Sequence, residues 1–209
     1  RVHRRVYTDP AIFDAEMDRI YGNAWLFVAH ESHIAEPGQY VTAHLGERPM
    51  IVARHTDGEI YVFANRCTHR GMKVCGARRG SKKRFVCPYH GWAFATDGSL
   101  IGIPHGKGYN GKIDPKDPGL ALDRAARVDS YRGFVFACKA EDGPSLTDYL
   151  GPMTRALDNM IDRAPGGEIE MTGGGFRQRY KGNWKLHMEN ANDLMHASIV
   201  HASSVDAAQ

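Results

Sequence analysis

No run of apolar residues in this sequence approaches the roughly 20 that a membrane-spanning helix requires, so we expect no membrane segment. The first ten residues, RVHRRVYTDP, lack the apolar stretch of a secretory signal. They also lack an initiator methionine, and we expect a few residues to precede them. No stripe of Lys and Arg interleaved with aromatic residues is present, which argues against a nucleic-acid-binding protein.

Cysteine is scarce, with four in 209 residues, and two of the four stand close to a histidine. This usage is more typical of metal ligation in a reducing compartment than of a disulfide framework. The chain is 42% hydrophobic and 24% charged, with a net charge of +3, as in ordinary folded proteins. We therefore expect a globular, cytoplasmic protein.

The periodicity of the sequence changes along the chain. Apolar residues at helical spacing after Asp9 and Pro10 predict an amphipathic helix over residues 10–22. From 24 to 140, short runs rich in Val, Ile, Phe and Tyr alternate with Gly, Pro and Asp, which predicts a compact antiparallel β domain. The predicted strands are 25–30, 39–45, 49–55, 59–65, 84–88, 92–96, 99–103 and 131–139. Further along, we predict a helix over 145–164 broken at Pro152, a glycine-interrupted strand over 168–186 and a helix over 187–204.

Two short motifs each combine a cysteine with a histidine: Cys67-Thr-His69 and Cys87-Pro-Tyr-His90. The 17 residues between them, 70–86, are long enough for a hairpin to place the second loop beside the first. A structural zinc ion accepts Cys2His2, but zinc sites usually pair Cys with Cys and His with His. Mixed pairs suit a [2Fe–2S] cluster in which one iron takes both cysteines and the other both histidines. The spacing therefore favours the cluster over zinc.

The pattern C-x-H-x17-C-x2-H, followed by Gly91 and Trp92, resembles the Rieske [2Fe–2S] signature. Tyr89 stands where respiratory Rieske proteins carry an additional cysteine, so the sequence resembles the lower-potential centres of ferredoxins and oxygenases. Cys75 and Cys138 are then expected to be small, buried apolar residues rather than ligands.

A second constellation, D-x2-H-x4-H, is formed by Asp193, His196 and His201. Two histidines five residues apart on a regular helix diverge by roughly 140°. Convergence on one metal ion would need a π-bulge or a break between them. The alternative is a polar helix whose histidines are satisfied by other partners.

Taken together, the two motifs and the segment N-W-K at residues 183–185 resemble the large subunit of Rieske non-haem iron ring-hydroxylating oxygenases. The resemblance implies that His196 and His201 are two ligands of a 2-His-1-carboxylate iron site, Fe(II), with open positions for O2. It implies that Asp193 links an iron-bound histidine to a Rieske histidine of a neighbouring subunit. The third iron ligand is then an aspartate beyond residue 209, and the chain is the first half of a longer subunit.

The same resemblance implies an α+β fold. An antiparallel β Rieske [2Fe–2S] domain is expected at residues 29–145, followed at 146–209 by the start of an α+β, helix-grip-like catalytic domain. Residues 1–28 are expected to form an N-terminal helix and strand that pack on the catalytic domain.

The implied function is the terminal oxygenase of a multicomponent aromatic-ring hydroxylating dioxygenase. Its partners would be O2, an aromatic substrate such as an aromatic acid, and a ferredoxin or reductase that delivers electrons from NAD(P)H. A homotrimer is implied, and a small β subunit is left open. The alternatives are a Rieske monooxygenase or O-/N-demethylase, a Rieske-type electron carrier and a cluster-binding regulatory protein. The basic run at residues 78–84 is either a solvated hairpin tip or a docking patch for an acidic partner.

Overall fold

The computed structural model describes residues 2–171, 180–203 and 207. The chain divides into two compact units, one formed by residues 17–175 and the other by residues 1–16 together with 176–209. None of the helices in the described ranges has both the length and the apolar character needed to cross a bilayer.

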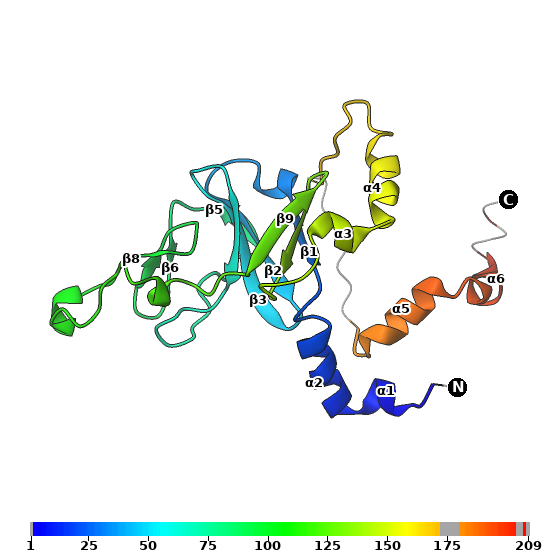
Figure 1. Ribbon diagram of the computed structural model, residues 1–209, viewed down its shortest axis with the longest axis horizontal. Helices are drawn as coiled ribbons and strands as arrows, with labels where there is room; N and C mark the ends of the chain where they lie inside the picture. Colours follow the sequence, from blue (N-terminus) through cyan, green and yellow to red (C-terminus); the bar gives the residue numbers. More distant parts are fainter. Residues whose placement is uncertain (1, 172–179, 204–206, 208–209) are drawn as a thin grey trace. The chain divides into compact units, whose positions relative to one another are not determined.

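The larger unit contains three antiparallel sheets (Figure 1), with strand orders β4-β3-β2-β5, β1-β10-β9 and β6-β7-β8. The strands are β1 (Leu26–His30), β2 (Gln39–Leu45), β3 (Arg48–Arg54), β4 (Ile60–Ala64), β5 (Arg79–Ser81), β6 (Phe85–Val86), β7 (Ala93–Phe94), β8 (Leu100–Gly102), β9 (Arg127–Tyr131) and β10 (Phe134–Cys138). Each of the eight predicted segments contains a strand, which confirms the predicted antiparallel β domain.

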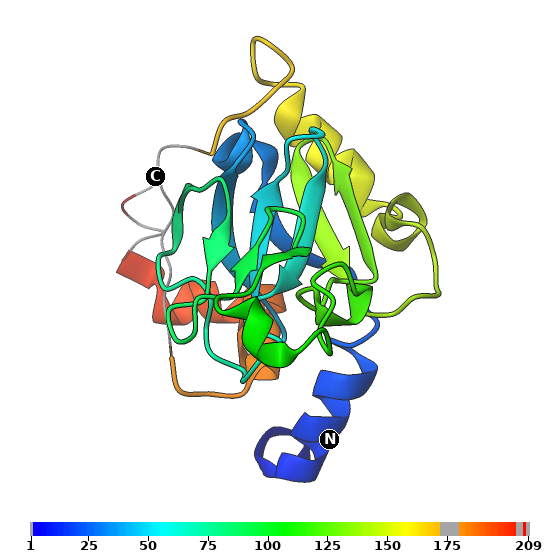
Figure 2. The ribbon, with the colours of Figure 1, turned by 90° about the vertical axis from the view of Figure 1, so that its left-hand side faces the viewer.

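The β4-β3-β2-β5 sheet lies between the other two sheets (Figure 2). Side chains alternate between its two faces, so it contributes to a core on each side. On β3, Ile51 and Ala53 belong to the core shared with β6-β7-β8, whereas Met50 and Val52 belong to the core shared with β1 and β10. On β4, Phe63 belongs to the first core and Val62 to the second. The first core also contains Cys67, Cys87 and Trp92, so it connects the middle sheet to both Cys/His loops.

One predicted strand, 131–139, is wrong in its extent. Arg132 (φ 52°) and Gly133 (φ 85°) form the turn between β9 and β10, both with left-handed backbone. A two-residue turn of this kind matches the twist of the strands that it joins. The sequence did not reveal it, because arginine rarely occupies the first turn position. β5 was also missed, and it lies inside the basic run 78–84.

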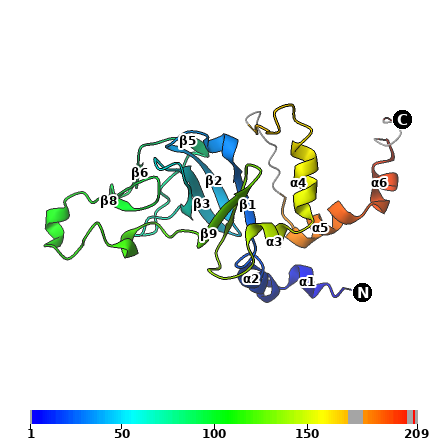
Figure 3. The same cartoon turned by 45° about the horizontal axis from the view of Figure 1, so that its top comes forward.

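Helices follow the last strand of this unit. The predicted helix 145–164 is two helices, α3 (Leu146–Leu150) and α4 (Met153–Ile161), separated at Gly151 and Pro152. The Ser145 side chain accepts a hydrogen bond from the backbone N–H of Asp148 and so caps α3. The described residues of this unit also form three short 3₁₀ helices: η1 (Glu31–Ile34), η2 (Gly106–Tyr109) and η3 (Pro118–Leu120). The loop that carries η2 projects from β8, away from the middle sheet (Figure 3).

The smaller unit is helical, with α1 (Arg5–Thr8), the start of α2 (Pro10–Arg19), α5 (Trp184–Asn192) and α6 (Met195–Val200). The strand predicted over 168–186 is wrong wherever the structure describes it, since residues 168–171 and 180–183 are not in a strand and residues 184–186 begin α5. The cause is Asn183, whose side-chain oxygen accepts a hydrogen bond from the N–H of Lys185 and caps the helix. Residues 172–179 of that predicted strand lie outside the described part of the chain.

β1 spans the domain boundary that was predicted at residue 28. It pairs with β10, from Leu26 opposite Ala137 to His30 opposite Phe134. The strand therefore belongs to the β-sheet unit and not to the helical N-terminal segment. The predicted domain boundaries themselves stay predictions.

Candidate functional site: two Cys/His loops and a histidine pair

The two Cys/His motifs lie on two loops of similar construction. The first loop (residues 66–73) follows β4, and the second loop (residues 87–92) connects β6 to β7. In each loop the peptide N–H and C=O of the cysteine are bonded within the loop: Cys67 to Met72 and Gly71, and Cys87 to Trp92 and Gly91, at 2.8–3.0 Å. These bonds hold each cysteine at the base of a tight turn with its histidine at the tip.

The histidines of the two loops face each other. The ring centroids of His69 and His90 lie 4.8 Å apart with an interplanar angle of 68°. Trp92 stacks flat on His69 at 4.9 Å, and the Tyr89 ring lies 3.8 Å from His90. The Nδ1 atom of His69 is buried and has no hydrogen-bond partner in the structure. A buried polar atom without a partner is costly, and a metal ion would satisfy it.

The cysteines complete a set of two sulfur and two nitrogen donors. Cys67 and Cys87 are both 3% exposed and neither forms a disulfide. Burial raises the pKa of the Cys67 thiol, and the adjacent Cys87 acts in the same direction. Burial, together with the neighbouring imidazole of His90, lowers the pKa of His69. The neutral imidazole is the form that binds metal, and a metal ion displaces the thiol proton. These residues therefore fit the predicted cluster.

A glycine directly after the second histidine is required by close packing. Gly91 has φ +72°, and a Cβ atom there would lie 2.8 Å from Cγ of Pro104, in the loop that follows β8. Any other residue would both strain the backbone and push the second loop away from this contact.

The second motif lies at the junction of α5 and α6. Asp193 follows α5, and its Oδ1 accepts hydrogen bonds from the N–H groups of Met195 (2.9 Å) and His196 (3.4 Å). The aspartate thus caps α6, a structural role that the sequence analysis did not assign. The predicted single helix 187–204 is divided at this residue.

The two histidines of this motif converge. The rings of His196 and His201 have centroids 5.5 Å apart at an interplanar angle of 72°. The two rings can approach each other because α6 ends before His201, and no π-bulge is involved. His201 directly follows the last helical residue, and its backbone (φ −112°, ψ 27°) is no longer helical. The Nδ1 atom of His196 is buried without a hydrogen-bond partner, and Oδ2 of Asp193 lies 3.8 Å from it. The imidazole pair fits two positions of an iron site.

In the described part of the chain, no group of three or more His, Cys, Asp and Glu side chains is placed to hold one metal ion. The histidine pair therefore has no third ligand among these residues.

Sequence reasoning missed an anchor between the N-terminal helix and α5. The Glu16 carboxylate accepts a hydrogen bond from Nε1 of Trp184 (2.9 Å) and pairs with Nζ of Lys185 (2.5 Å). The Glu16 and Lys185 side chains are only 11% and 15% exposed. Asn183 donates to the C=O of Tyr7 at 3.1 Å. No spacing rule connects residues 168 positions apart, so the sequence carried no signal for it.

Replacing Glu16 with glutamine should loosen α5, because a neutral amide cannot hold both the indole N–H and the ammonium group. We expect the full-length subunit to lose about 1.5 kcal/mol of stability and to retain less mononuclear iron after dialysis. Thermal unfolding and iron analysis measure both effects. Glu47→Gln, at an exposed position in the β2–β3 turn, is the matched control. Equal effects in the two variants would contradict an anchoring role.

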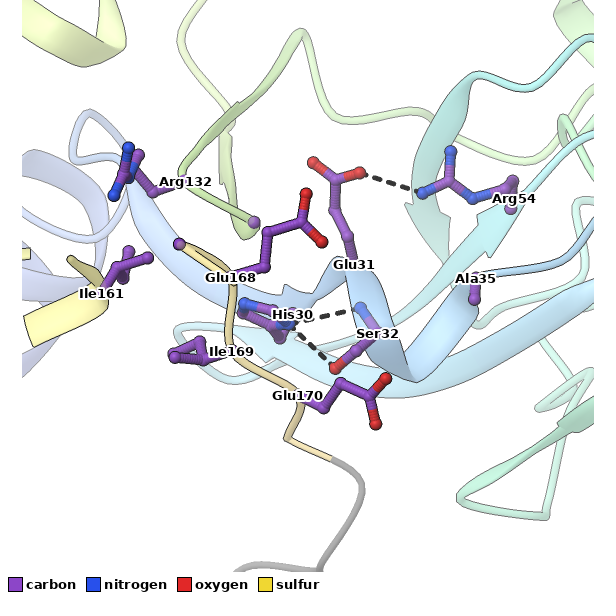
Figure 4. Close-up of a pocket in the computed structure, with 12 residues that line it drawn as sticks. His30, Glu31, Ser32, Ala35, Arg54, Arg132, Ile161, Glu168, Ile169 and Glu170 are labelled. Carbon is purple, nitrogen blue, oxygen red and sulfur yellow. Dashed lines mark hydrogen bonds and ion pairs between the residues drawn. The ribbon is translucent and has the colours of Figure 1, made fainter. Parts of the chain in front are cut away.

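The larger unit contains a cavity of about 500 Å³ (Figure 4). Some of its polar side chains are paired with one another: Arg54 with Glu31 at 3.1 Å, and His30 with Ser32 at 2.9 Å. None of the predicted site residues lines it.

Comparison with known proteins agrees with this geometry. Residues 24–120 match the family model of the Rieske [2Fe–2S] domain. The chain is 39% identical over 203 residues to toluate 1,2-dioxygenase subunit alpha of Pseudomonas putida, covering 96% of this chain and 44% of that protein. It is 41% identical over 200 residues to the N,N-dimethyl phenylurea N-demethylase subunit alpha of Sphingobium sp. (strain YBL2), covering 95% and 43%. The crystal structure of naphthalene 1,2-dioxygenase from Rhodococcus sp. bound to indole is similar with a TM-score of 0.84 and 40% identity, over 95% of this chain and 45% of that one. The chain thus spans less than half the length of these relatives.

Proposed function

Because this chain belongs to the Rieske non-haem iron aromatic-ring-hydroxylating oxygenases, we propose that it is the electron-accepting part of a terminal oxygenase large subunit. The observation that carries the proposal is that one chain contains both donor sets. Two buried thiols lie beside two facing imidazoles in the larger unit, and a second imidazole pair converges in the smaller unit. A pure electron carrier has no use for the second pair.

When bound, a [2Fe–2S] cluster supplies single electrons and a mononuclear Fe(II) supplies O2 chemistry. In the proposal, Cys67 and Cys87 hold one iron of the cluster, and His69 and His90 hold the other. The low exposure of both thiols keeps water away from the sulfur ligands. Stacking of Trp92 restrains the ring of His69 against rotation.

His196 and His201 would hold the mononuclear iron together with a carboxylate outside the chain. Asp193 would fix the orientation of a histidine and connect the two metal centres across a subunit boundary, in a head-to-tail homotrimer. Oδ1 of its carboxylate caps α6, which leaves Oδ2, 3.8 Å from Nδ1 of His196, for this task. A carboxylate that orients a metal-bound imidazole also fixes its tautomer.

The proposed reaction is hydroxylation of an aromatic substrate, and an aromatic acid is one candidate, as in the relative named for toluate. Demethylation on the same scaffold is the second candidate, since a relative that is 41% identical is named as an N-demethylase. We place the protein in the cytoplasm with a ferredoxin or reductase as its electron donor, with or without a small β subunit.

The test is a product assay with the full-length subunit, a matched reductase and 18O2. The substrates are aromatic acids, aromatic hydrocarbons and N-methyl phenylureas. Two labelled atoms in one product support dioxygenation, and one labelled atom with release of formaldehyde supports demethylation. A reducible cluster with no substrate-dependent O2 uptake on any of them would refute the oxygenase and favour an electron carrier.

A strongly basic surface accompanies the first loop and the hairpin after it. The sequence contains no acidic residue between Glu59 and Asp97. The charged side chains of residues 66–84 are therefore all cationic, and all are exposed: Arg66, Arg70, Lys73, Arg78, Arg79, Lys82, Lys83 and Arg84. Within the described ranges none of them forms an ion pair. These cationic side chains lie on the first loop, which would carry two of the cluster ligands, and on the hairpin after it, and their positive potential suits encounter with an acidic electron donor.

Reversing two of these charges, Lys82→Glu with Lys83→Glu, should slow electron delivery. At low ionic strength we expect the second-order rate constant for cluster reduction by the donor to fall about 10-fold or more. The slope of log k against ionic strength should also flatten. Stopped-flow reduction measures both, with Arg155→Glu and Arg163→Glu, at and after α4, as the control pair. A wild-type rate that does not depend on salt would count against docking at this surface.

A further inference from the structure

One buried amide closes the neck of the first loop. Asn65 is 2% exposed and stands two residues before Cys67. Its Oδ1 accepts hydrogen bonds from the N–H groups of Val74 (3.1 Å) and Cys75 (2.8 Å), and its Nδ2 donates to the C=O of Cys75 (2.8 Å). Its own N–H donates to the C=O of Pro49 on β3 at 2.8 Å. The residue entering the loop is thus tied to the two residues leaving it and to the middle sheet.

The second loop is closed in a different way. Its ends are joined by strand pairing, with Val86 of β6 opposite Ala93 of β7. The two strands that flank the first loop are not paired with each other. β4, which ends at Ala64, pairs with β3, whereas the next strand, β5, pairs with β2. The side chain of Asn65 supplies one C=O and one N–H, the same pair of groups that a peptide unit offers. It therefore replaces the missing ladder at this neck.

We propose that Asn65 is a positioning residue for the metal cluster: its side chain holds residues 66–73 closed so that Cys67 and His69 face the second loop. The inference rests on the proposed function, in which these two residues are ligands. Without the amide, the backbone groups of residues 74 and 75 would be buried without partners, and the loop would gain freedom to open. Residues that orient metal ligands from behind commonly alter affinity by about 10–100-fold.

The experiment uses the full-length subunit with the substitution Asn65→Ala. Four quantities are measured: iron and sulfide per chain, the EPR spectrum of the reduced cluster, the rate of iron release to a chelator, and the melting temperature. At a temperature where circular dichroism shows a folded protein, we expect release about 10-fold faster than in wild type, with a shifted or broadened EPR signal. In Asn65→Ser the hydroxyl can accept one of the hydrogen bonds, so its iron-release rate should lie between those of wild type and Asn65→Ala. This variant replaces Asn65→Ala in the experiment if the alanine variant does not fold.

The control is Val52→Ala in β3, a fully buried position whose side chain belongs to the other core and not to the core that contains Cys67 and Cys87. It should keep the wild-type EPR spectrum and release rate at temperatures where it is folded. Wild-type release and spectrum in the folded Asn65 variants would overturn the proposal. So would equal release from Val52→Ala, because Asn65 would then act only through general stability. Absence of a Rieske signal from the wild-type protein would instead refute the proposed function.

Discussion

Replacing Cys87 with alanine is expected to abolish the Rieske absorption and EPR signals of the full-length subunit. The thiol is buried at the base of the second loop beside Cys67, and nothing else among the described residues near it offers sulfur in the right place. Cys75 is in the same core, but its backbone is held by Asn65 on the exit side of the first loop. Iron and sulfide content should fall to background, and turnover should fall with them, while the mononuclear iron is retained.

Cys138→Ala is the matched control for this prediction. Cys138 is also fully buried, but it lies on β10 and contacts Arg127 and the C=O of Asn23. Its loss should lower stability by about 1 kcal/mol and leave both signals intact. A Cys87→Ala protein with a normal Rieske spectrum would show that the ligand set has been assigned wrongly.

The second large effect is expected from Asp193→Asn, which should leave the Rieske spectrum intact and reduce coupled turnover about 100-fold or more. The substitution is nearly isosteric, and the amide oxygen can still accept the hydrogen bonds from Met195 and His196 that cap α6. The substitution removes the negative charge beside His196; in the wild-type chain, Oδ2 of Asp193 lies 3.8 Å from Nδ1 of His196. Single-turnover oxidation of the reduced cluster in the presence of substrate and O2 measures the effect.

Two further variants separate the charge from the cap. Asp193→Ala removes both, and it should lose about 1 kcal/mol of stability in addition. Asp14→Asn removes an exposed charge from α2 and should change neither turnover nor stability. If Asp193→Asn forms product at the wild-type rate and coupling, then the aspartate is a helix cap only.

The two Cys/His motifs could be found in the sequence because their spacing is short. Cys67 and His69 share one turn, as do Cys87 and His90, and such local geometry leaves little freedom to the fold. The alternation of apolar residues likewise predicted β2, β3 and β4 of the middle sheet, since each has one face on either core. It did not predict β5, whose three residues are all exposed. The turn at Arg132 was not predictable in this way, because a left-handed arginine leaves no mark in composition.

The sequence by itself determined which donors are present, in what order, and that two loops of similar length carry the first four. Tertiary structure alone decided how they meet. The imidazoles of His69 and His90 approach to 4.8 Å because separate sheets support the two loops and share one core. Likewise, the convergence of His196 and His201 depends on where α6 stops, and the position of α5 depends on Glu16, far away in the chain. The physical reason is that periodicity and spacing report only local backbone geometry. Contacts between distant residues are selected by the burial and hydrogen bonding of the whole fold.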